Sequence, residues 1–329
     1  MNILVIGLGS MGKRRLRLLQ QYCIVEKKKD WHLFGVDSSK ERCGEVERLF
    51  KVKTFMTIDE ALEEQKFDGV VISTPPLSHS KIIEQCLQNN LHVFSEINLV
   101  NDKYNENIKL ANKNNKILFL SSTFMYRKEI EFLKKYIKKE KKGSYSYHIG
   151  QYLPEWHPWE NYKNYFVNEH RTNACREIFA IDLPWLIDIF GSPKEIYSLH
   201  KKISNLELNY DDTYIVTIEH SSGIIGNLII DIVTPKTERS FKFWNENKYI
   251  EWLRTPDSLK IFNNEKKELD QICLYDKTNH QSGYNSFIIE NAYYDEIVNF
   301  IDTINNNAIA KYSFERDKEV LEWIDRIEK

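Results

Sequence analysis

The chain has 329 residues, with 46 basic and 48 acidic side chains. This length allows two domains with separate cores, because one hydrophobic core rarely grows beyond roughly 250 to 300 residues. The small net charge gives no positive field for nucleic acid or an anionic membrane. Polar residues interrupt every apolar run before the roughly 20 residues that a bilayer requires. The five cysteines form no CxxC pair, and no basic leader follows Met1. We therefore expect a cytoplasmic protein without a membrane span, disulfides or a metal site.

The first 120 residues alternate short apolar runs with helical stretches, which predicts repeated βα units and a parallel, doubly wound sheet. We expect strands at 3–6, 32–36, 52–55, 70–73, 92–95 and 117–120, and helices at 11–21, 39–49, 58–65, 79–89 and 102–114. Right-handed crossovers place the carboxyl ends of such strands at one edge of the sheet. We predict a Rossmann domain over residues 1–123.

The pattern changes in the second part of the chain, where strands alternate with short turns and few helices. We expect strands at 144–150, 196–202, 213–220, 224–233, 241–244, 249–253 and 259–262, and helices at 178–190, 285–304 and 314–328. These elements predict an α+β domain over residues 124–329, with an open, mainly antiparallel sheet. An exposed sheet favours a homodimer or homotetramer.

The strongest motif directly follows the first strand and opens the first helix. It consists of Gly7, Leu8, Gly9, Ser10, Met11 and Gly12. Gly7 permits the tight turn, Gly9 lets the backbone approach a pyrophosphate, and Gly12 lets the helix lie close to the strand. Asp37 ends the second strand, where a carboxylate accepts hydrogen bonds from ribose hydroxyls and repels a 2'-phosphate. The predicted cofactor is therefore NAD, although Lys40 and Arg42 lie nearby.

Further candidates for the cofactor site follow the fourth and fifth strands. They are Ser73, Thr74, Pro75, Pro76, His79 and Glu96. The two prolines lack N–H groups and fix the backbone direction beside the dinucleotide. We expect His79 to begin the next helix, where it either contacts the ligand or serves only as a polar cap. Glu96 is a candidate for binding either cofactor or substrate.

These segments together resemble the glucose-fructose oxidoreductase and inositol dehydrogenase (Gfo/Idh/MocA) family. The resemblance implies a Rossmann domain followed by an α/β domain whose open sheet often mediates oligomer contacts. It also implies that the substrate is a sugar, a cyclitol or a nucleotide-linked sugar.

Two departures from the family pattern affect the expected chemistry. The family usually has Glu-Lys-Pro after its fifth strand, whereas this chain has Glu96, Ile97 and Asn98. Isoleucine cannot donate a proton, so the usual lysine contribution is absent. Ile181 stands where many relatives have a histidine, and Glu177 replaces the aspartate one helical turn earlier. The usual acid/base pair is therefore missing, while Glu177 and Ile181 share one helix face.

The segment 152–160 offers a replacement. His157 titrates in the useful range and is our first candidate for the base, with Glu177 and Tyr162 as further catalytic candidates and Tyr165 and Arg171 as secondary ones. Packing of this loop on the sheet is the equally weighted alternative. Candidate substrate-binding residues are Glu96, Tyr126, Arg127, Trp156, Arg171 and Arg176. The last two arginines could hold an acidic group in a forked contact or form salt bridges to Glu169 or Glu177.

The leading hypothesis is an NAD-dependent oxidoreductase that transfers hydride between a sugar-like substrate and nicotinamide. Loss of both usual catalytic positions supports a second hypothesis, a catalytically silent protein that binds NAD and a ligand. A third hypothesis is a glycosidase that oxidises and re-reduces the sugar within one cycle.

Overall fold

The computed structural model describes residues 1–157, 160–253, 255–281 and 288–329. The contacts divide the chain into two compact units. The first contains Met1–Thr123 and Ala292–Lys318, and the second contains Phe124–Asn291 and Glu319–Lys329. Each unit therefore consists of two separate segments of the chain, whereas we predicted two continuous domains, 1–123 and 124–329.

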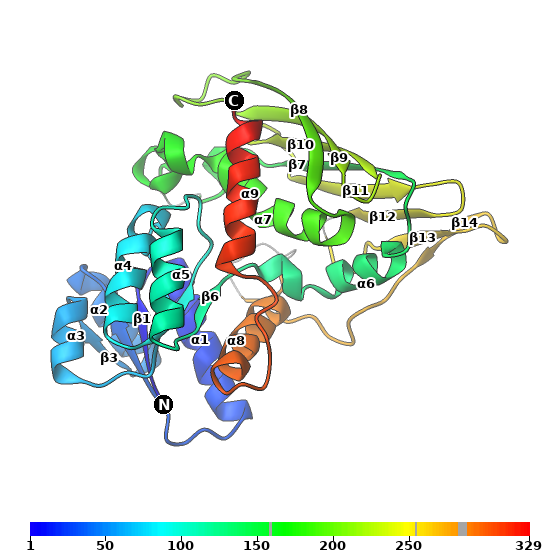
Figure 1. Cartoon of the computed structure of the whole chain (residues 1–329). Coiled ribbons are helices and arrows are strands. Elements are labelled where there is room, and N and C mark those ends of the chain that lie inside the picture. Colours follow the sequence, from blue (N-terminus) through cyan, green and yellow to red (C-terminus); the bar gives the residue numbers. More distant parts are fainter. Residues whose placement is uncertain (158–159, 254, 282–287) are drawn as a thin grey trace. The chain divides into compact units, whose positions relative to one another are not determined.

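The first unit is built on a six-stranded parallel sheet with the order β3-β2-β1-β4-β5-β6 (Figure 1). Its strands are β1 (Asn2–Ile6), β2 (His32–Val36), β3 (Lys53–Phe55), β4 (Gly69–Ile72), β5 (His92–Ser95) and β6 (Leu118–Leu120). Its helices are α1 (Ser10–Val25), α2 (Lys40–Phe50), α3 (Ile58–Glu64), α4 (Pro76–Gln88) and α5 (Tyr104–Lys113). The central strands β1 and β4 are almost wholly buried, as expected for a parallel sheet that helices cover on both faces. The predicted Rossmann fold is confirmed.

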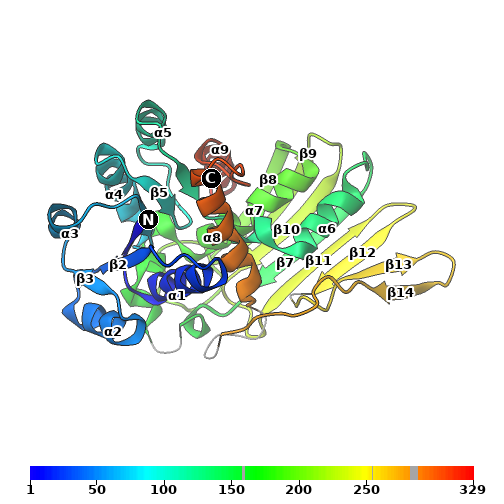
Figure 2. The same ribbon diagram turned by 90° about the horizontal axis from the view of Figure 1, so that it is seen from below.

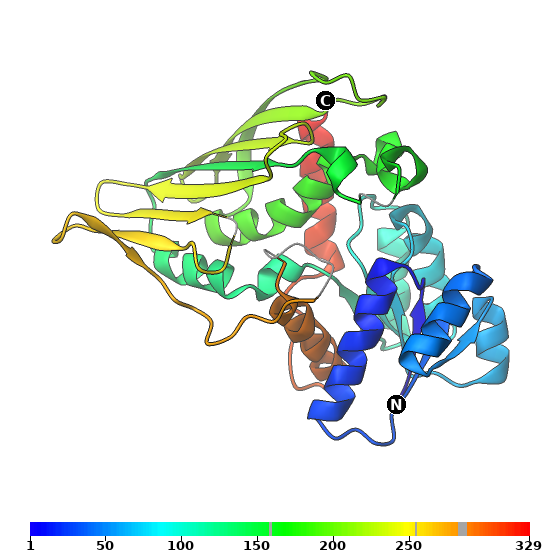
Figure 3. The same ribbon diagram turned by 180° about the vertical axis from the view of Figure 1, so that it is seen from behind.

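A distant segment completes the first unit. Helix α8 (Glu290–Ile304) lies alongside α1, which Figures 2 and 3 show from two directions. The next helix, α9 (Phe314–Ile327), begins in the first unit and ends in the second. Because α1 carries the glycine motif, residues near the end of the chain help to fix the helix on which the predicted cofactor site is built.

The second unit contains an eight-stranded sheet with the order β14-β13-β12-β11-β7-β10-β9-β8. Its strands are β7 (Ser144–Gly150), β8 (Pro193–Lys201), β9 (Thr213–His220), β10 (Ile225–Asp231), β11 (Glu238–Trp244), β12 (Tyr249–Leu253), β13 (Lys260–Asn263) and β14 (Glu268–Gln271). Only the β7–β10 pair is parallel, so the predicted mainly antiparallel sheet is confirmed. Helices α6 (Lys128–Ile137) and α7 (Ala174–Phe190) lie on one face of this sheet (Figure 2).

The opposite face of this sheet carries exposed apolar side chains. Tyr197 and Leu199 on β8 are 67% and 72% exposed, and Leu199 pairs in register with the exposed Ile215 of β9. The edge strand β14 was not predicted, because its residues Glu-Leu-Asp-Gln lack the alternation of a half-buried strand.

Helices α4 and α7 both begin three or more residues earlier than predicted. Helix α4 begins at Pro76 rather than His79, because proline fits the first helical position, where no N–H is needed. Helix α7 begins at Ala174 rather than 178, because the Asn173 side chain caps it by accepting a hydrogen bond from the Arg176 N–H at 2.8 Å. Within the described ranges, no helix is both long enough and apolar enough to cross a bilayer.

Candidate functional site

The three glycines of the turn after β1 differ in how much space a side chain would find there. Gly7 has φ +90°, and a Cβ atom there would lie 2.7 Å from the Ser73 carbonyl oxygen. A Cβ on Gly12 would lie 1.8 Å from the carbonyl oxygen of Gly7. A Cβ on Gly9, by contrast, would meet no protein atom within 4 Å. The fold itself therefore requires Gly7 and Gly12, whereas the open space at Gly9 suits a ligand that approaches the backbone.

The start of α1 is suited to a negatively charged group. Gly9 is the N-cap residue and provides no side-chain cap, and the first turn contains no acidic residue. The helix dipole and the N–H groups of the first turn favour an anion at this position. These features fit the diphosphate of a dinucleotide, with Gly9, Ser10, Met11 and Gly12 as the residues that would hold it.

The Asp37 carboxylate is fixed beside this turn by two backbone N–H groups. Its Oδ2 accepts a hydrogen bond from the Leu8 N–H at 2.8 Å, and its Oδ1 accepts one from the Ser39 N–H at 2.9 Å. The Arg42 guanidinium lies 3.6 Å from Oδ2. An oriented carboxylate at the end of β2 is the group expected to bind ribose hydroxyls. The sequence analysis placed Asp37 in this role but did not predict its contact with Leu8.

The His79 side chain stabilises the turn between β4 and α4. This side chain is buried, its Nε2 lies 2.7 Å from the Thr74 carbonyl oxygen, and its Nδ1 lies 2.6 Å from Oδ1 of Asn98. Burial lowers the His79 pKa, which keeps the ring neutral near pH 7. Both predicted roles of His79, as a ligand contact or a polar cap at the helix start, therefore need correction, because both ring nitrogens are engaged inside the fold.

The same turn presents Thr74 and the two prolines. The Thr74 hydroxyl lies 2.7 Å from the Ser78 hydroxyl, Pro75 is exposed, and Pro76 is buried as the first residue of α4. The Ser73 N–H donates to the Ile6 carbonyl oxygen at 2.7 Å, which joins this turn to the end of β1. The glycine turn and the β4–α4 turn therefore lie side by side, as the parallel sheet predicts.

Glu96 is committed to an ion pair inside the first unit. Its Oε1 lies 2.5 Å from Nε of Arg15, and Nη2 of the same guanidinium lies 2.7 Å from Oε2 of Glu296. Glu296 also accepts a hydrogen bond from the Ser122 N–H at 2.7 Å. Burial raises the Glu296 pKa, although Arg15 opposes this effect. The sequence analysis missed Arg15, whose only signal is an arginine on the buried face of α1.

In the second unit, Glu177 lies in the first turn of α7. Burial raises its pKa to about 7, and no charged or hydrogen-bonding partner contributes to this change. The structure gives the carboxyl group no hydrogen bond within the described ranges. A carboxyl group with this pKa can both give and accept a proton near neutral pH.

His157 and Glu177 both interact with Tyr165. The His157 and Tyr165 ring centroids are 5.0 Å apart, and the negative charge of Glu177 adds to the effect of burial in raising the Tyr165 pKa. Burial lowers the His157 pKa, so this ring is mostly neutral near pH 7. The second unit thus groups two of the predicted catalytic residues around a tyrosine. Pro158 and Trp159, the next residues of this loop, lie outside the described residues.

The remaining candidates take part in internal contacts. The Tyr162 hydroxyl accepts a hydrogen bond from the Glu207 N–H at 3.2 Å, and its catalytic role stays a prediction. The Trp156 Nε1–H donates to the Gln151 carbonyl oxygen at 3.3 Å, and Tyr126 is buried. Arg171 lies exposed in the 3-10 helix His170–Thr172.

Two of the arginines predicted to bind substrate, Arg127 and Arg176, form ion pairs within the protein. The Arg127 guanidinium is paired with Glu129 at 2.6 Å. The Arg176 guanidinium contacts Asp325 at 2.7 Å and also Glu328. Both guanidinium groups therefore bind carboxylates of the protein, and Asp325 and Glu328 were not among the partners that the sequence indicated for Arg176.

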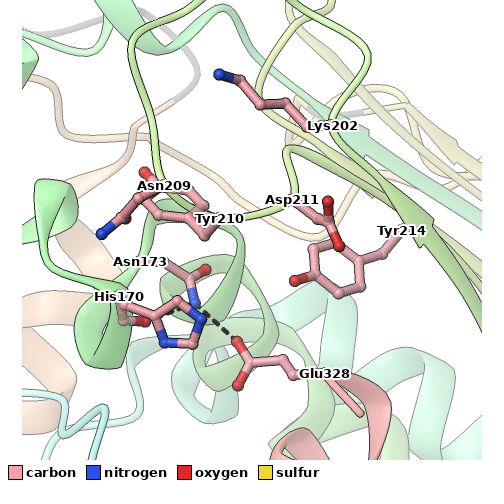
Figure 4. Close-up of a pocket in the computed structure, with 8 residues that line it drawn as sticks. All are labelled: His170, Asn173, Lys202, Asn209, Tyr210, Asp211, Tyr214 and Glu328. Carbon is pink, nitrogen blue, oxygen red and sulfur yellow. Dashed lines mark hydrogen bonds between the residues drawn. The ribbon is translucent and has the colours of Figure 1, made fainter.

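A polar pocket of about 310 Å³ lies elsewhere in the second unit (Figure 4). Its charged lining groups bond to the protein. Glu328 accepts from the Asn173 amide at 2.8 Å, and Asp211 lies 2.6 Å from Nδ1 of His200. The Lys202 ammonium donates to the Leu208 carbonyl oxygen at 3.0 Å. These pairs satisfy the groups that a charged ligand would use. Among the residues the structure describes, no cluster of three or more His, Cys, Asp or Glu side chains could hold a metal ion.

Comparisons with known proteins agree with this architecture. No curated protein matches the chain. Many solved structures do match, including a UDP-N-acetylglucosamine 3-dehydrogenase from Acidithiobacillus ferrooxidans with 16% identity and a TM-score of 0.74, over 100% of this chain and 96% of that one. A myo-inositol 2-dehydrogenase from Lactobacillus plantarum has 16% identity and a TM-score of 0.77, over 99% of this chain and 96% of that one. The WlbA dehydrogenase from Chromobacterium violaceum, in complex with NADH and UDP-GlcNAcA, has 14% identity and a TM-score of 0.75, over 99% of this chain and 92% of that one.

At these identities the likenesses show a shared fold. The family model described as an oxidoreductase family with an NAD-binding Rossmann fold matches residues 1–122. This range contains the glycine turn, Asp37 and the β4–α4 turn. The match to the Gfo/Idh/MocA oxidoreductase family model is therefore confined to these first 122 residues.

Proposed function

We propose that this protein is an NAD(H)-dependent oxidoreductase that acts on a sugar, a sugar derivative or a nucleotide-linked sugar. The observation that carries the proposal is the open space at Gly9, at the uncapped start of α1 and beside the oriented Asp37 carboxylate. The bound nicotinamide supplies the hydride chemistry. The first unit holds the cofactor, and the second unit holds the substrate.

The preference for NAD over NADP rests on Asp37. Its two carboxylate oxygens are held by Leu8 and Ser39, so the charge cannot move away from an incoming 2'-phosphate. Arg42 is the competing influence, because its exposed guanidinium could bind the same phosphate. We infer that the fixed carboxylate dominates, since Arg42 is a flexible surface side chain already close to Asp37.

Glu177 is the proposed acid/base of the reaction. Oxidation of a secondary alcohol removes a hydride from carbon and a proton from oxygen, and a carboxylate with a pKa of about 7 can take that proton near neutral pH. His157, which we ranked first from the sequence, is the secondary candidate, and its neutral ring near pH 7 is the form that can accept a proton. The structurally similar dehydrogenases suggest myo-inositol, UDP-N-acetylglucosamine and UDP-GlcNAcA as the first substrates to test.

A Gly9→Ala variant tests the cofactor site, with Gly44→Ala as the matched control. A Cβ at either position meets no protein atom within 4 Å, so both variants should fold. We expect calorimetry to show at least tenfold weaker NADH binding for Gly9→Ala and unchanged binding for Gly44→Ala. Equal NADH affinity in the two variants would exclude this cofactor site.

Turnover is tested by following the absorbance of reduced nicotinamide with the sugar panel and NAD. A rise that depends on both protein and sugar supports the proposal. The second candidate, a protein that binds NAD and sugar without turnover, is favoured by Ile97 and Ile181, and it predicts binding without any absorbance change. Release of a free sugar from a glycoside without net NADH would instead indicate the glycosidase.

We also propose that the open sheet face mediates a homodimer or homotetramer. Tyr197, Leu199 and Ile215 form an exposed apolar strip across β8 and β9. Sedimentation velocity should show an oligomer that Leu199→Lys weakens or dissociates. A wild-type monomer at micromolar concentration would refute this part.

A further inference from the structure

The Tyr165 hydroxyl is a buried polar group without a partner. Among the described residues, it is the only tyrosine whose buried hydroxyl makes no hydrogen bond. Four other tyrosines of the second unit form a hydrogen bond through the hydroxyl group. The pairs are Tyr145 with His220, Tyr147 with Asp182, Tyr210 with Val167 and Tyr275 with Glu129. Buried hydroxyl groups in native proteins are normally hydrogen-bonded, so an exception requires a cause.

The ring of Tyr165 is held in place although its hydroxyl is not. It packs against His157 with ring centroids 5.0 Å apart, and it meets Phe166 edge to face at 5.9 Å. The residue joins two short 3-10 helices, Tyr162–Asn164 and Phe166–Asn168. The unsatisfied hydroxyl is therefore presented by a fixed ring, as a preorganised donor requires.

Glu177 is the second polar group that this inference uses, and its side chain is only partly buried. Its carboxyl group makes no hydrogen bond within the described ranges, and it is close enough to Tyr165 for its charge to affect the phenol. One group can accept a proton, and the other can donate a hydrogen bond. A sugar hydroxyl complements both, because it donates its proton and accepts through its oxygen lone pairs.

We propose that Tyr165 is a catalytic residue that donates a hydrogen bond to the reacting oxygen of a sugar secondary alcohol, while Glu177 takes the proton from that oxygen. The inference rests on the proposed function. During oxidation, the O–H bond of the alcohol would break and its proton would go to the Glu177 carboxylate. The C–O bond would become C=O as the C–H bond breaks, and a bound nicotinamide, when present, would supply the hydride acceptor. Reduction runs the same steps in reverse.

The roles cannot be exchanged between the two residues. Burial and the charge of Glu177 raise the Tyr165 pKa, so the phenol keeps its proton throughout the physiological range. Tyr165 can therefore only donate a hydrogen bond, which stabilises the negative charge that develops on the oxygen. Loss of one such donor typically lowers the rate by about 100-fold to 1000-fold.

The test compares Tyr165→Phe with Tyr210→Phe. The first substitution removes the unpaired hydroxyl and leaves the ring contacts in place. The second removes a hydroxyl that already donates to the Val167 carbonyl oxygen at 2.7 Å. We expect Tyr165→Phe to keep the wild-type Tm and NADH affinity and to lower kcat by about 100-fold. Tyr210→Phe should lower Tm and keep kcat within about threefold, because it breaks only an internal bond.

Two further readouts separate this inference from the proposed function. The pH dependence of kcat in Tyr165→Phe should retain the transition of Glu177, because only the donor has been removed. Binding of each panel sugar to the NADH-saturated protein should weaken at least fivefold in Tyr165→Phe and remain unchanged in Tyr210→Phe.

Each outcome decides one claim. Wild-type turnover that Tyr165→Phe leaves unchanged overturns the role of Tyr165 and preserves the proposed function. In a further outcome, the wild type binds a sugar through Tyr165 but does not oxidise it. This result overturns the proposed oxidoreductase function and the catalytic role of Tyr165, and it supports a contact between the Tyr165 hydroxyl and the sugar. A wild-type protein that neither binds nor oxidises any sugar of the panel overturns both.

Discussion

Replacing Glu177 by glutamine should stabilise the protein at neutral and alkaline pH. Burial raises the pKa of this carboxyl group from 4.5 to about 7, so the folded state disfavours its charged form. At about 1.4 kcal/mol for each pKa unit, the difference corresponds to about 3 kcal/mol. Because the side chain is only partly buried by surface area, solvent screening reduces our expectation to about 2 kcal/mol.

The sign of the pH dependence follows from the two protonation states. Below about pH 4.5, Glu177 is protonated in the folded and unfolded chains, and the stability it confers is fully present. Between about pH 4.5 and 7, the unfolded chain loses its proton first, so stability is progressively lost. Above about pH 7, the folded protein carries the buried charge and the full deficit remains. Glutamine is neutral throughout and avoids this loss.

Urea unfolding at several pH values between 4.5 and 9 measures the effect. The free energy of unfolding of Glu177→Gln should equal that of the wild type at the lowest pH and exceed it by about 2 kcal/mol at pH 8. Glu41→Gln is the matched control, because Glu41 occupies the first turn of α2 and is exposed. If the difference between Glu177→Gln and the wild type does not change with pH, the argument from burial is refuted. The same variant should lose most of its turnover.

Three further variants test the first unit. We expect the wild type to bind NADH at least tenfold more tightly than NADPH, and Asp37→Ser to reduce this ratio to within about threefold. Calorimetry that shows tighter NADPH binding by the wild type would refute the role of Asp37. Gly12→Ala should lower the urea midpoint by the equivalent of about 1–3 kcal/mol or more, because its Cβ would lie 1.8 Å from the Gly7 carbonyl oxygen, and an unchanged midpoint would contradict the packing argument. Arg15→Met should destabilise the protein by about 3–5 kcal/mol at pH 8, because it leaves Glu296 buried and unpaired. Protonation of that carboxyl should make the loss smaller at pH 5, whereas an equal loss at both pH values would argue against an electrostatic cause.

The cofactor half of the site was predictable from local sequence. A glycine turn between strand and helix, and an acid at the end of the next strand, are separated by few residues, and their positions follow from the regular geometry of βα units. The structure places Gly7, Gly9, Gly12 and Asp37 accordingly. His79 was misjudged, because its partners are a backbone carbonyl group and Asn98, and no periodicity reveals such a pair.

The catalytic half was predictable only as a set of residue types. His157 and Glu177 could be named because imidazole and carboxyl groups handle protons, but their ranking changed once burial was known. Tyr165 stood among the secondary candidates, and only the missing partner of its hydroxyl distinguishes it from the other tyrosines. Arg176 was chosen as a substrate-binding residue, because the sequence could not show that its guanidinium forms ion pairs with carboxylates near the end of the chain.

The sequence by itself determined the two kinds of sheet, the order of most of their strands in the chain, and the glycine turn at the start of the first helix. These features arise from interactions between neighbouring residues and from the alternation of apolar and polar side chains. Only the tertiary structure decided which charges neutralise each other and which remain unpaired. Arg15 and Glu296 are 281 positions apart, and the pKa of Glu177 depends on how completely the folded chain excludes water from it. Such effects depend on distances in space, which local sequence patterns do not contain.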